Sequence, residues 1–179
     1  KFSLLAIPFF ILAGVIMGRA QISDKIIRLI MLMVGPVSGG MAIVTIITAL
    51  FWGAVSGSGP ATVAAIGTIL IPGMVKAGYD RGFAAALTSS ASGLAIVIPP
   101  SIGFIVYGVI TGASISELFL AGIIPGILVG LFLIVAAFII SVARGYKGDR
   151  FGTAKEVLGA LKDAFWALLT PVIILGGIY

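Results

Sequence analysis

An uncharged apolar segment, Met41 to Val75, is too long for one membrane-spanning helix and carries a polar interruption at its centre. A spanning helix needs about 17 to 25 apolar residues. The interruption, Gly53 to Ala61 (GAVSGSGPA), concentrates glycine and proline, which weaken helices. Because hydrocarbon offers no partner to freed backbone groups, protein, water or an ion must satisfy them. The segment therefore has to fold back on itself around a polar turn.

The composition places the whole chain in a membrane. Of its 179 residues, 60% are hydrophobic and only 9% are charged, against about 25% charged in soluble domains. Three further uncharged runs are long enough to span a bilayer: Phe2 to Gly18, Gly82 to Thr111 and Leu118 to Ala143. The short alternating segments of membrane barrels are absent. We therefore expect an all-α membrane protein.

Several function classes are disfavoured by what the sequence lacks. Cysteine and histidine are both absent, which removes disulfides, the commonest transition-metal ligands and the usual general base. We therefore expect neither an enzyme nor a transition-metal site. The net charge of +5 comes from residues scattered at the ends of apolar runs. This pattern is typical of membrane flanks, with the lipid bilayer as the surroundings, and not of a nucleic-acid-binding surface.

The polar interruption predicts a re-entrant helical hairpin over residues 41–75. A break at Ser56 to Pro60 leaves two arms of about 15 residues, or about 22 Å each, which is shorter than the ~30 Å hydrocarbon core. The next crossing, 82–111, is predicted to be a discontinuous helix. It is interrupted at Ser89 to Gly93 and again at Pro99-Pro100, and resumes around Ser101 or Gly103.

The remaining segments predict two spanning helices and two interfacial ones. A spanning helix is expected over 1–18, and an interfacial helix over 23–34 with Ser23-Asp24 as its N-cap. Ser114 and Glu117 have capping-box spacing at the start of helix 118–143, which carries glycines every fourth residue. The amphipathic stretch from Thr153 predicts a second interfacial helix, and the chain re-enters the membrane from Phe165.

These elements predict four regions. Residues 1–40 form a scaffold helix and an arm helix, 41–113 half of a transport domain, 114–164 a second scaffold helix and arm, and 165–179 the start of a second repeat. The repeat is indicated by Ile7 to Ile16, which aligns without gaps to Thr170 to Tyr179 and shares a proline, a leucine and a glycine. Three crossings separate the two copies, so the second copy is inverted. Inverted repeats with broken helices are typical of secondary transporters.

Charge placement supports this topology. Ten of the eleven basic residues fall on one side of the predicted membrane, and the turn from Thr111 to Glu117 has none. The basic side is cytoplasmic by the positive-inside rule. The hairpin is thus expected to enter from the cytoplasm.

The two polar breaks together predict a binding site made of neutral oxygens. Hydroxyls of Ser56 and Ser58, carbonyls of Gly57 and Gly59, and carbonyls of the Val97 to Pro100 break suit a hard cation such as Na+. The helix end after Pro60 suits an anionic group. The candidate substrate-binding residues are Ser58, Gly59, Pro60, Ser92, Pro100 and Ser101. A channel or pore-lining scaffold without alternating access is the alternative.

Four motifs in order resemble one transporter family: SGSGPA at Ser56 to Ala61, IPGMVKAGYD at Ile71 to Asp80, IPPS at Ile98 to Ser101 and SISELFLAGIIPG at Ser114 to Gly126. They are similar to the large membrane subunit of tripartite ATP-independent periplasmic (TRAP) transporters. The resemblance covers nearly the whole chain and corresponds to about the first repeat of a longer subunit, lacking its first helix or two.

The resemblance implies an elevator-type, sodium-coupled importer in the inner membrane of a bacterium or archaeon. Its partners would be a small membrane (Q) subunit and a periplasmic substrate-binding protein that delivers an organic acid anion, of the C4-dicarboxylate or sugar-acid type. It implies sodium ligands at the hairpin tip and the broken helix, for which the candidates are Ser56, Gly57, Ser58, Gly93, Val97 and Pro99.

The chain departs from the pattern of this family at two places. Val15 stands where an acidic residue often follows the Ala-Gly of the first helix, and Ala95-Ile96 where a Gly-Pro is common. The second departure lies just before the Pro99-Pro100 break, so it bears on how the backbone carbonyls of that break are oriented.

Overall fold

The computed structural model describes residues 2–19, 22–150 and 152–178, and within these ranges the regular structure is entirely helical. The prediction of an all-helical membrane protein is confirmed. Lys1, Gln21 and Tyr179, which bound or lie beside predicted segments, are outside the described residues. The elements in chain order are η1 (Phe2–Leu5), α1 (Ala6–Arg19), α2 (Ile22–Val34), α3 (Gly40–Ser56), α4 (Gly59–Lys76), α5 (Arg81–Gly93), η2 (Leu94–Ile96), α6 (Ile102–Thr111), α7 (Ile115–Ala143) and α8 (Ala154–Ile178).

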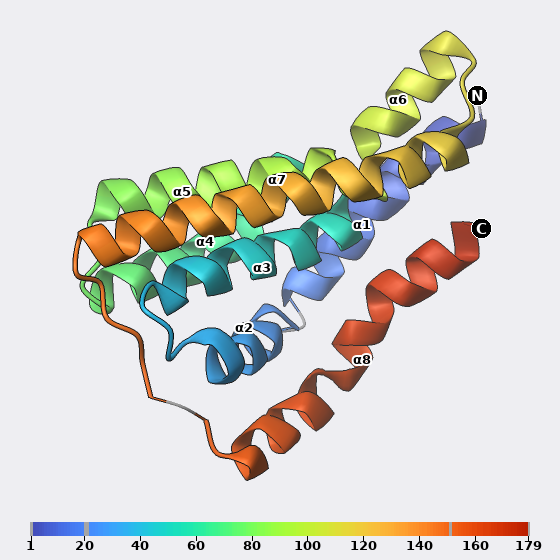
Figure 1. Ribbon diagram of the computed structural model, residues 1–179. Coiled ribbons are helices and arrows are strands. Elements are labelled where there is room, and N and C mark those ends of the chain that lie inside the picture. The colour runs from blue at the N-terminus through green and yellow to red at the C-terminus, as the bar shows by residue number, and fades with distance from the viewer. Residues whose placement is uncertain (1, 20–21, 151, 179) are drawn as a thin grey trace.

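Three of these helices, α4, α7 and α8, are long and apolar enough to cross a membrane. The pair α1 and α2 would make a fourth span if counted as one broken helix, but the two meet at 69°. The chain therefore turns away from the direction of α1 when it enters α2 (Figure 1).

The predicted N-cap at Ser23-Asp24 is wrong. Ile22 is already helical, so Ser23 lies inside α2, where its side chain is buried. The physical reason is packing of α2 on α8, which buries one face of α2. A small serine side chain fits into such a face. The second core lies between these two helices and contains Ile26, Leu29, Ala160, Ala164 and Ala167.

The interrupted segment forms a helical hairpin, with α3 and α4 joined by only Gly57 and Ser58. Its arms have 17 and 18 residues, or about 26 and 27 Å at 1.5 Å per residue. The arms are longer than the 15 residues expected, because α4 begins at Gly59 and Pro60 fits into its first turn. Because α4 includes Pro60 in its first turn, the turn between the two arms is shorter than it would be if α4 began only after the proline.

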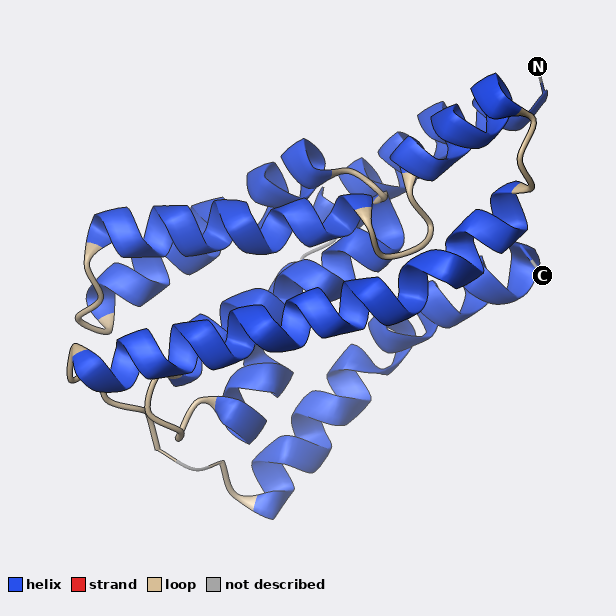
Figure 2. Ribbon diagram, turned by 45° about the horizontal axis from the view of Figure 1, so that its top comes forward, coloured by secondary structure: helices blue, strands red, loops and turns tan. Residues whose placement is uncertain are grey.

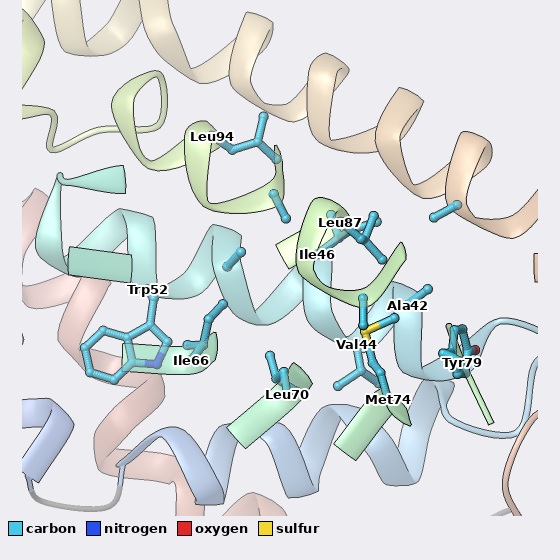
Figure 3. Packing of buried hydrophobic residues seen from close by; sticks show 14 of the residues in the cluster. Ala42, Val44, Ile46, Trp52, Ile66, Leu70, Met74, Tyr79, Leu87 and Leu94 are labelled. Carbon is cyan, nitrogen blue, oxygen red and sulfur yellow. The ribbon is translucent and has the colours of Figure 1, made fainter. Parts of the chain in front are cut away.

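The main core surrounds α3, which packs against α4, α5 and α7. Trp52, Ile66, Leu70, Met74 and Leu87 fill the space between these helices (Figure 3). This close packing fixes the hairpin and the broken helix relative to each other.

The glycines of α7 bring that helix close to its neighbours, as their spacing predicts. Gly122, Gly126 and Gly130 are buried. A Cβ at Gly126 would lie 2.7 Å from Ile98 Cγ1, and one at Gly130 would lie 3.2 Å from Leu50. With ~1.5 Å rise per residue, Gly122 and Gly126 lie about 10 to 17 Å from the start of α7. The break in the second helix therefore lies well inside the length of a helix able to span the membrane.

The ends of the molecule differ in charge as predicted. The α4–α5 turn and the α7–α8 linker share one end, where Lys76, Arg81, Arg144 and Lys147 lie (Figure 1). The α6–α7 connection, which has no basic residue, lies at the opposite end near the N-terminus, and Figure 2 shows the same arrangement.

The two predicted repeat copies run in opposite directions. In Figures 1 and 2, α1 leads away from the end where the N-terminus lies, whereas the last turns of α8 lead back toward it. The amphipathic stretch from Thr153 and the apolar stretch from Phe165 belong to one continuous helix, α8. The directions match those expected of an inverted repeat.

Candidate functional site

The hairpin tip is a tight turn that needs glycine at one position. Gly57 adopts the left-handed conformation with φ of 62°, and its N–H donates to the Gly53 carbonyl at 2.9 Å. Ser58 follows in an extended conformation as the N-cap of α4, and its hydroxyl accepts from the Ala61 N–H at 3.4 Å. Left-handed backbone costs other L-residues about 1 to 2 kcal/mol. The tip therefore combines a backbone reversal with a capped helix start.

The predicted break at the double proline is present. After α5 the chain makes one 3-10 turn, Leu94–Ile96, and then an irregular turn and bend over residues 97–100, with a cis peptide between Pro99 and Pro100. Ser101 then caps α6, accepting from the Phe104 N–H at 3.3 Å, while its own hydroxyl donates to the Ile96 carbonyl at 2.5 Å. One serine thus holds both sides of the break.

The expected interruption at Ser89 to Gly93 is wrong, because α5 continues through Gly93. Its last backbone groups stay bonded, with the Leu94 N–H donating to the carbonyls of Ala91 and Ser92. A glycine in a helix costs only about 1 kcal/mol relative to alanine. Favourable packing of α5 on α3 and α4 exceeds that cost.

The tip and the break meet through their backbones. The Ile102 N–H donates to the Gly57 carbonyl at 3.1 Å. A Cβ at Gly57 would lie 2.6 Å from the Pro100 carbonyl oxygen, and one at Gly59 would lie 3.2 Å from the Ser92 carbonyl oxygen. We call this contact, formed by Gly57, Gly59, Ser92, Pro100 and Ile102, the tip–break joint.

Hydroxyls reinforce the tip from within. Ser56 Oγ and Thr62 Oγ1 are 3.0 Å apart, and both side chains are buried. Thr62 Oγ1 also donates to the Ser58 carbonyl at 2.9 Å, and Ser56 Oγ accepts from the Ser58 N–H at 3.3 Å. Thr62 is not among the residues predicted from the sequence. Its position one helical turn after an N-cap serine is the signal that could have found it.

One buried hydroxyl at the joint has no partner. Ser92 is fully buried, and its Oγ makes no hydrogen bond with any described part of the chain. A buried hydroxyl without a partner costs roughly 1 to 3 kcal/mol. Most buried polar groups in native structures have a partner, and a water, an ion or a ligand can supply the one that is missing here.

The other predicted residues lie in different surroundings. The Val97 carbonyl oxygen faces α7, since a Cβ at Gly122 would lie 2.6 Å from it. Pro99 is buried beside Ala54 in a small apolar pocket of about 150 Å³. Gly93 and Pro60 are exposed. The structure therefore brings the predicted tip residues together with Ser92, Pro100 and Ser101, and turns Val97 toward α7.

An open groove runs beside the tip, between α1 and the hairpin. It has a volume of about 400 Å³, and Ser56 and Trp52 form part of its wall. Gly14 of α1 would place a Cβ 3.4 Å from the Ser56 Cβ. The first helix thus contacts the tip at Ser56.

The two segments that form the joint, residues 41 to 75 and 82 to 111, contain no Asp, Glu, His, Lys or Arg. Among the residues that the structure describes, no group of three Asp, Glu, His or Cys residues could hold a metal. The chemistry available at the joint is therefore that of hydroxyls, carbonyls and helix ends.

Comparison with known families gives the assignment. Residues 1–179 match the family described as "Tripartite ATP-independent periplasmic transporter, DctM component". The chain belongs to this DctM family. The resemblance expected from the four motifs is confirmed over the whole chain, and the relatives are transport permeases, not enzymes.

Several relatives are identical to this DctM-family chain at close to half of its residues. The isethionate TRAP transporter permease protein DctMQ of Oleidesulfovibrio alaskensis is 50% identical over 100% of the chain and 28% of its own length. The C4-dicarboxylate large permease protein DctM of Vibrio cholerae is 48% identical, over 99% of the chain and 39% of its own length. The ectoine large permease protein TeaC of Halomonas elongata is 45% identical, over 99% of the chain and 42% of its own length. The chain thus spans well under half the length of these relatives.

Proposed function

We propose that this chain is part of the large membrane subunit of a sodium-coupled secondary transporter that imports an organic acid anion. The observation that carries the proposal is the tip–break joint. Two polar chain breaks meet there by a backbone hydrogen bond, inside the length of a spanning helix, beside an unpaired buried hydroxyl.

Sodium is the coupling ion that fits the joint best. Neutral oxygens suit a hard cation of low charge. Ser92 Oγ is free to bind, and the Gly57 carbonyl keeps one lone pair after accepting from Ile102. The Ser92 carbonyl oxygen, close to Gly59, is the third candidate ligand. Ser56 and Ser58 act here by holding the tip in shape.

The substrate would bind through its acidic group at the start of α4. The positive end of that helix lies at the tip, where Ser58 caps it. Relatives are named for isethionate, C4-dicarboxylates and ectoine, all of which carry an acidic group. These names support a small organic acid as the substrate class.

The family and the charge pattern support a proposal for the assembly and its location. We propose a small membrane (Q) subunit and a periplasmic binding protein as partners. The Q subunit is supported by the relative named DctMQ, whose name combines the letters of the large (M) and small (Q) subunits. We further propose the inner membrane as the location, with the basic end cytoplasmic. The hairpin is then re-entrant, and the transport domain moves as an elevator between the arm helices.

The test compares Ser92→Ala with Ser90→Ala in the complete transporter reconstituted in proteoliposomes. Ser90 is exposed on the same helix and serves as the matched control. We expect Ser92→Ala to fold normally, because its hydroxyl has no partner in the described structure, and to raise the sodium concentration for half-maximal uptake about tenfold, as the loss of one good ligand worth ~1.4 kcal/mol would.

Equal sodium dependence in both variants would refute the assignment of Ser92. Uptake that does not saturate and needs no imposed sodium gradient would instead favour a pore.

A further inference from the structure

A second groove lies at the basic end of the molecule, away from the tip–break joint. It has a volume of about 490 Å³ and lies between the end of α4, the α2–α3 turn and the α7–α8 linker. Three segments that are far apart in the sequence line this one groove; Figure 1 shows that they lie at the same end of the molecule.

Hydrogen bonds and ring stacking hold the linker in place around this groove. The Asp149 N–H donates to the Gly35 carbonyl at 2.8 Å. Gly148 packs so closely against the Pro36 carbonyl that a Cβ at this position would clash with it. The Asp80 N–H donates to the Tyr146 hydroxyl at 3.1 Å, and the Tyr79 and Tyr146 rings stack at 4.1 Å between centroids. The recess is therefore built by tertiary contacts.

The groove has an apolar wall. Met31 and Met41 line it from α2 and α3, and Gly73 lines it from α4. A Cβ at Gly73 would lie 3.0 Å from Met41 Cε, so the absence of a side chain there keeps the groove open. Methionine side chains adapt readily to flexible apolar groups.

Two lysines and one aspartate make the opposite wall. Lys76 and Lys147 line the groove together with Asp149. The ion pairs of the described residues are Arg28–Asp163 and Arg150–Glu156, so neither lysine has an acidic partner within 4.0 Å there. The Lys147 and Gly148 backbone N–H groups also donate to no acceptor in the described ranges. The side chains that line the groove carry a net charge of +1.

We propose that this groove binds the headgroup phosphate of an anionic phospholipid, such as phosphatidylglycerol. A net charge of +1 matches one monoanionic phosphodiester, whereas Asp149 opposes a multivalent anion. The volume suits a headgroup and not a whole lipid, and the methionine wall suits the glycerol and the first methylenes. Lysines near the membrane surface attract anionic lipids, and this groove lies at the basic end of the chain.

The occupant would join the base of the hairpin to the linker that leaves α7. Lys76 belongs to the last turn of α4 and Lys147 to the linker. A phosphate bound by both lysines would brace these two segments.

The experiment uses the full-length subunit with its natural partners, purified in detergent and placed in nanodiscs of phosphatidylcholine with a minority of phosphatidylglycerol. Native mass spectrometry measures how much phosphatidylglycerol stays bound. The test variant is Lys76→Gln/Lys147→Gln. The control, Lys155→Gln/Lys162→Gln, removes the same charge from exposed positions on α8.

We expect the test variant to retain about thirtyfold less phosphatidylglycerol than the wild type, because the two lysines near the surface contribute ~1 kcal/mol each and ~1.4 kcal/mol corresponds to a tenfold change. The control should retain it. Lys76→Arg/Lys147→Arg should restore retention. Equal losses in both Gln variants would overturn the site in favour of general charge attraction, and no loss in either would overturn it outright. Equal retention of phosphatidylcholine and phosphatidylglycerol by the wild type would also refute the proposal. Unchanged thermal unfolding of the Gln variants in detergent shows that they are folded.

Discussion

Replacing Gly57 with alanine tests the tip–break joint most directly. Gly57 combines a left-handed backbone, with φ of 62°, and a Cβ position only 2.6 Å from the Pro100 carbonyl oxygen. Its own carbonyl accepts the Ile102 N–H, the hydrogen bond that ties the tip to the break. An alanine there strains the turn and also pushes the two segments apart.

The two effects can be separated with a matched glycine. Gly112 has a similar φ of 78°, but nothing lies within 4 Å of its Cβ position. Gly112→Ala therefore carries only the left-handed strain, about 1 to 2 kcal/mol. Gly57→Ala carries the same strain plus a lost hydrogen bond of about 1 kcal/mol and a steric displacement of backbone against backbone, about 1 kcal/mol or more.

The assay is thermal unfolding of the complete subunit in nanodiscs across a sodium titration. Gly57→Ala should be less stable than Gly112→Ala by about 2 kcal/mol. Because the proposed sodium ligands belong to the joint, the sodium concentration for half-maximal stabilisation should rise at least tenfold in Gly57→Ala and stay unchanged in Gly112→Ala.

An equal loss of stability in the two alanine variants would refute this prediction. That result would mean that the contact between the tip and the break contributes nothing beyond the turn itself. A large loss of stability with unchanged sodium dependence would keep the joint as a structural contact and refute it as the ion site.

Two further predictions concern packing and ionisation. Gly126→Ala should destabilise the protein by about 1 to 3 kcal/mol, because its Cβ would lie 2.7 Å from Ile98 Cγ1. Gly159→Ala, with open space around it, should stabilise the protein by about 0.5 to 1 kcal/mol. Chemical denaturation in micelles compares the two variants, and equal effects would contradict the packing of Gly126 against Ile98. The Asp80 N–H lowers the pKa of the Tyr146 hydroxyl, whereas burial raises the pKa of the Tyr79 hydroxyl. On raising the pH, Tyr146 should ionise first, so Tyr146→Phe removes the earlier phase of tyrosinate absorbance and Tyr79→Phe the later one; the reverse order would refute the assignment.

The local features of this protein follow from its sequence. Uncharged runs longer than a bilayer requires allow only helices in lipid, and Ser56 to Pro60 and Pro99-Pro100 mark where those helices stop. Ser114 caps α7 by accepting from the Glu117 N–H at 3.4 Å, as their spacing predicts. Each of these features depends only on residues that are close together in the sequence. They can therefore be predicted without the tertiary structure.

Contacts between segments were decided only by the tertiary structure. Gly57 meets Pro100, Val97 turns its carbonyl toward Gly122, and Thr62 completes the hydroxyl network of the tip. The tertiary structure also decided that α5 continues through Ser89 to Gly93. Packing of α5 on α3 and α4 outweighs the weak preference of serine and glycine against helix. The sequence thus determined that two polar breaks interrupt long uncharged apolar segments. Which oxygens they bring together depended on how α3, α5 and α7 pack, because a contact between distant residues has no local signal.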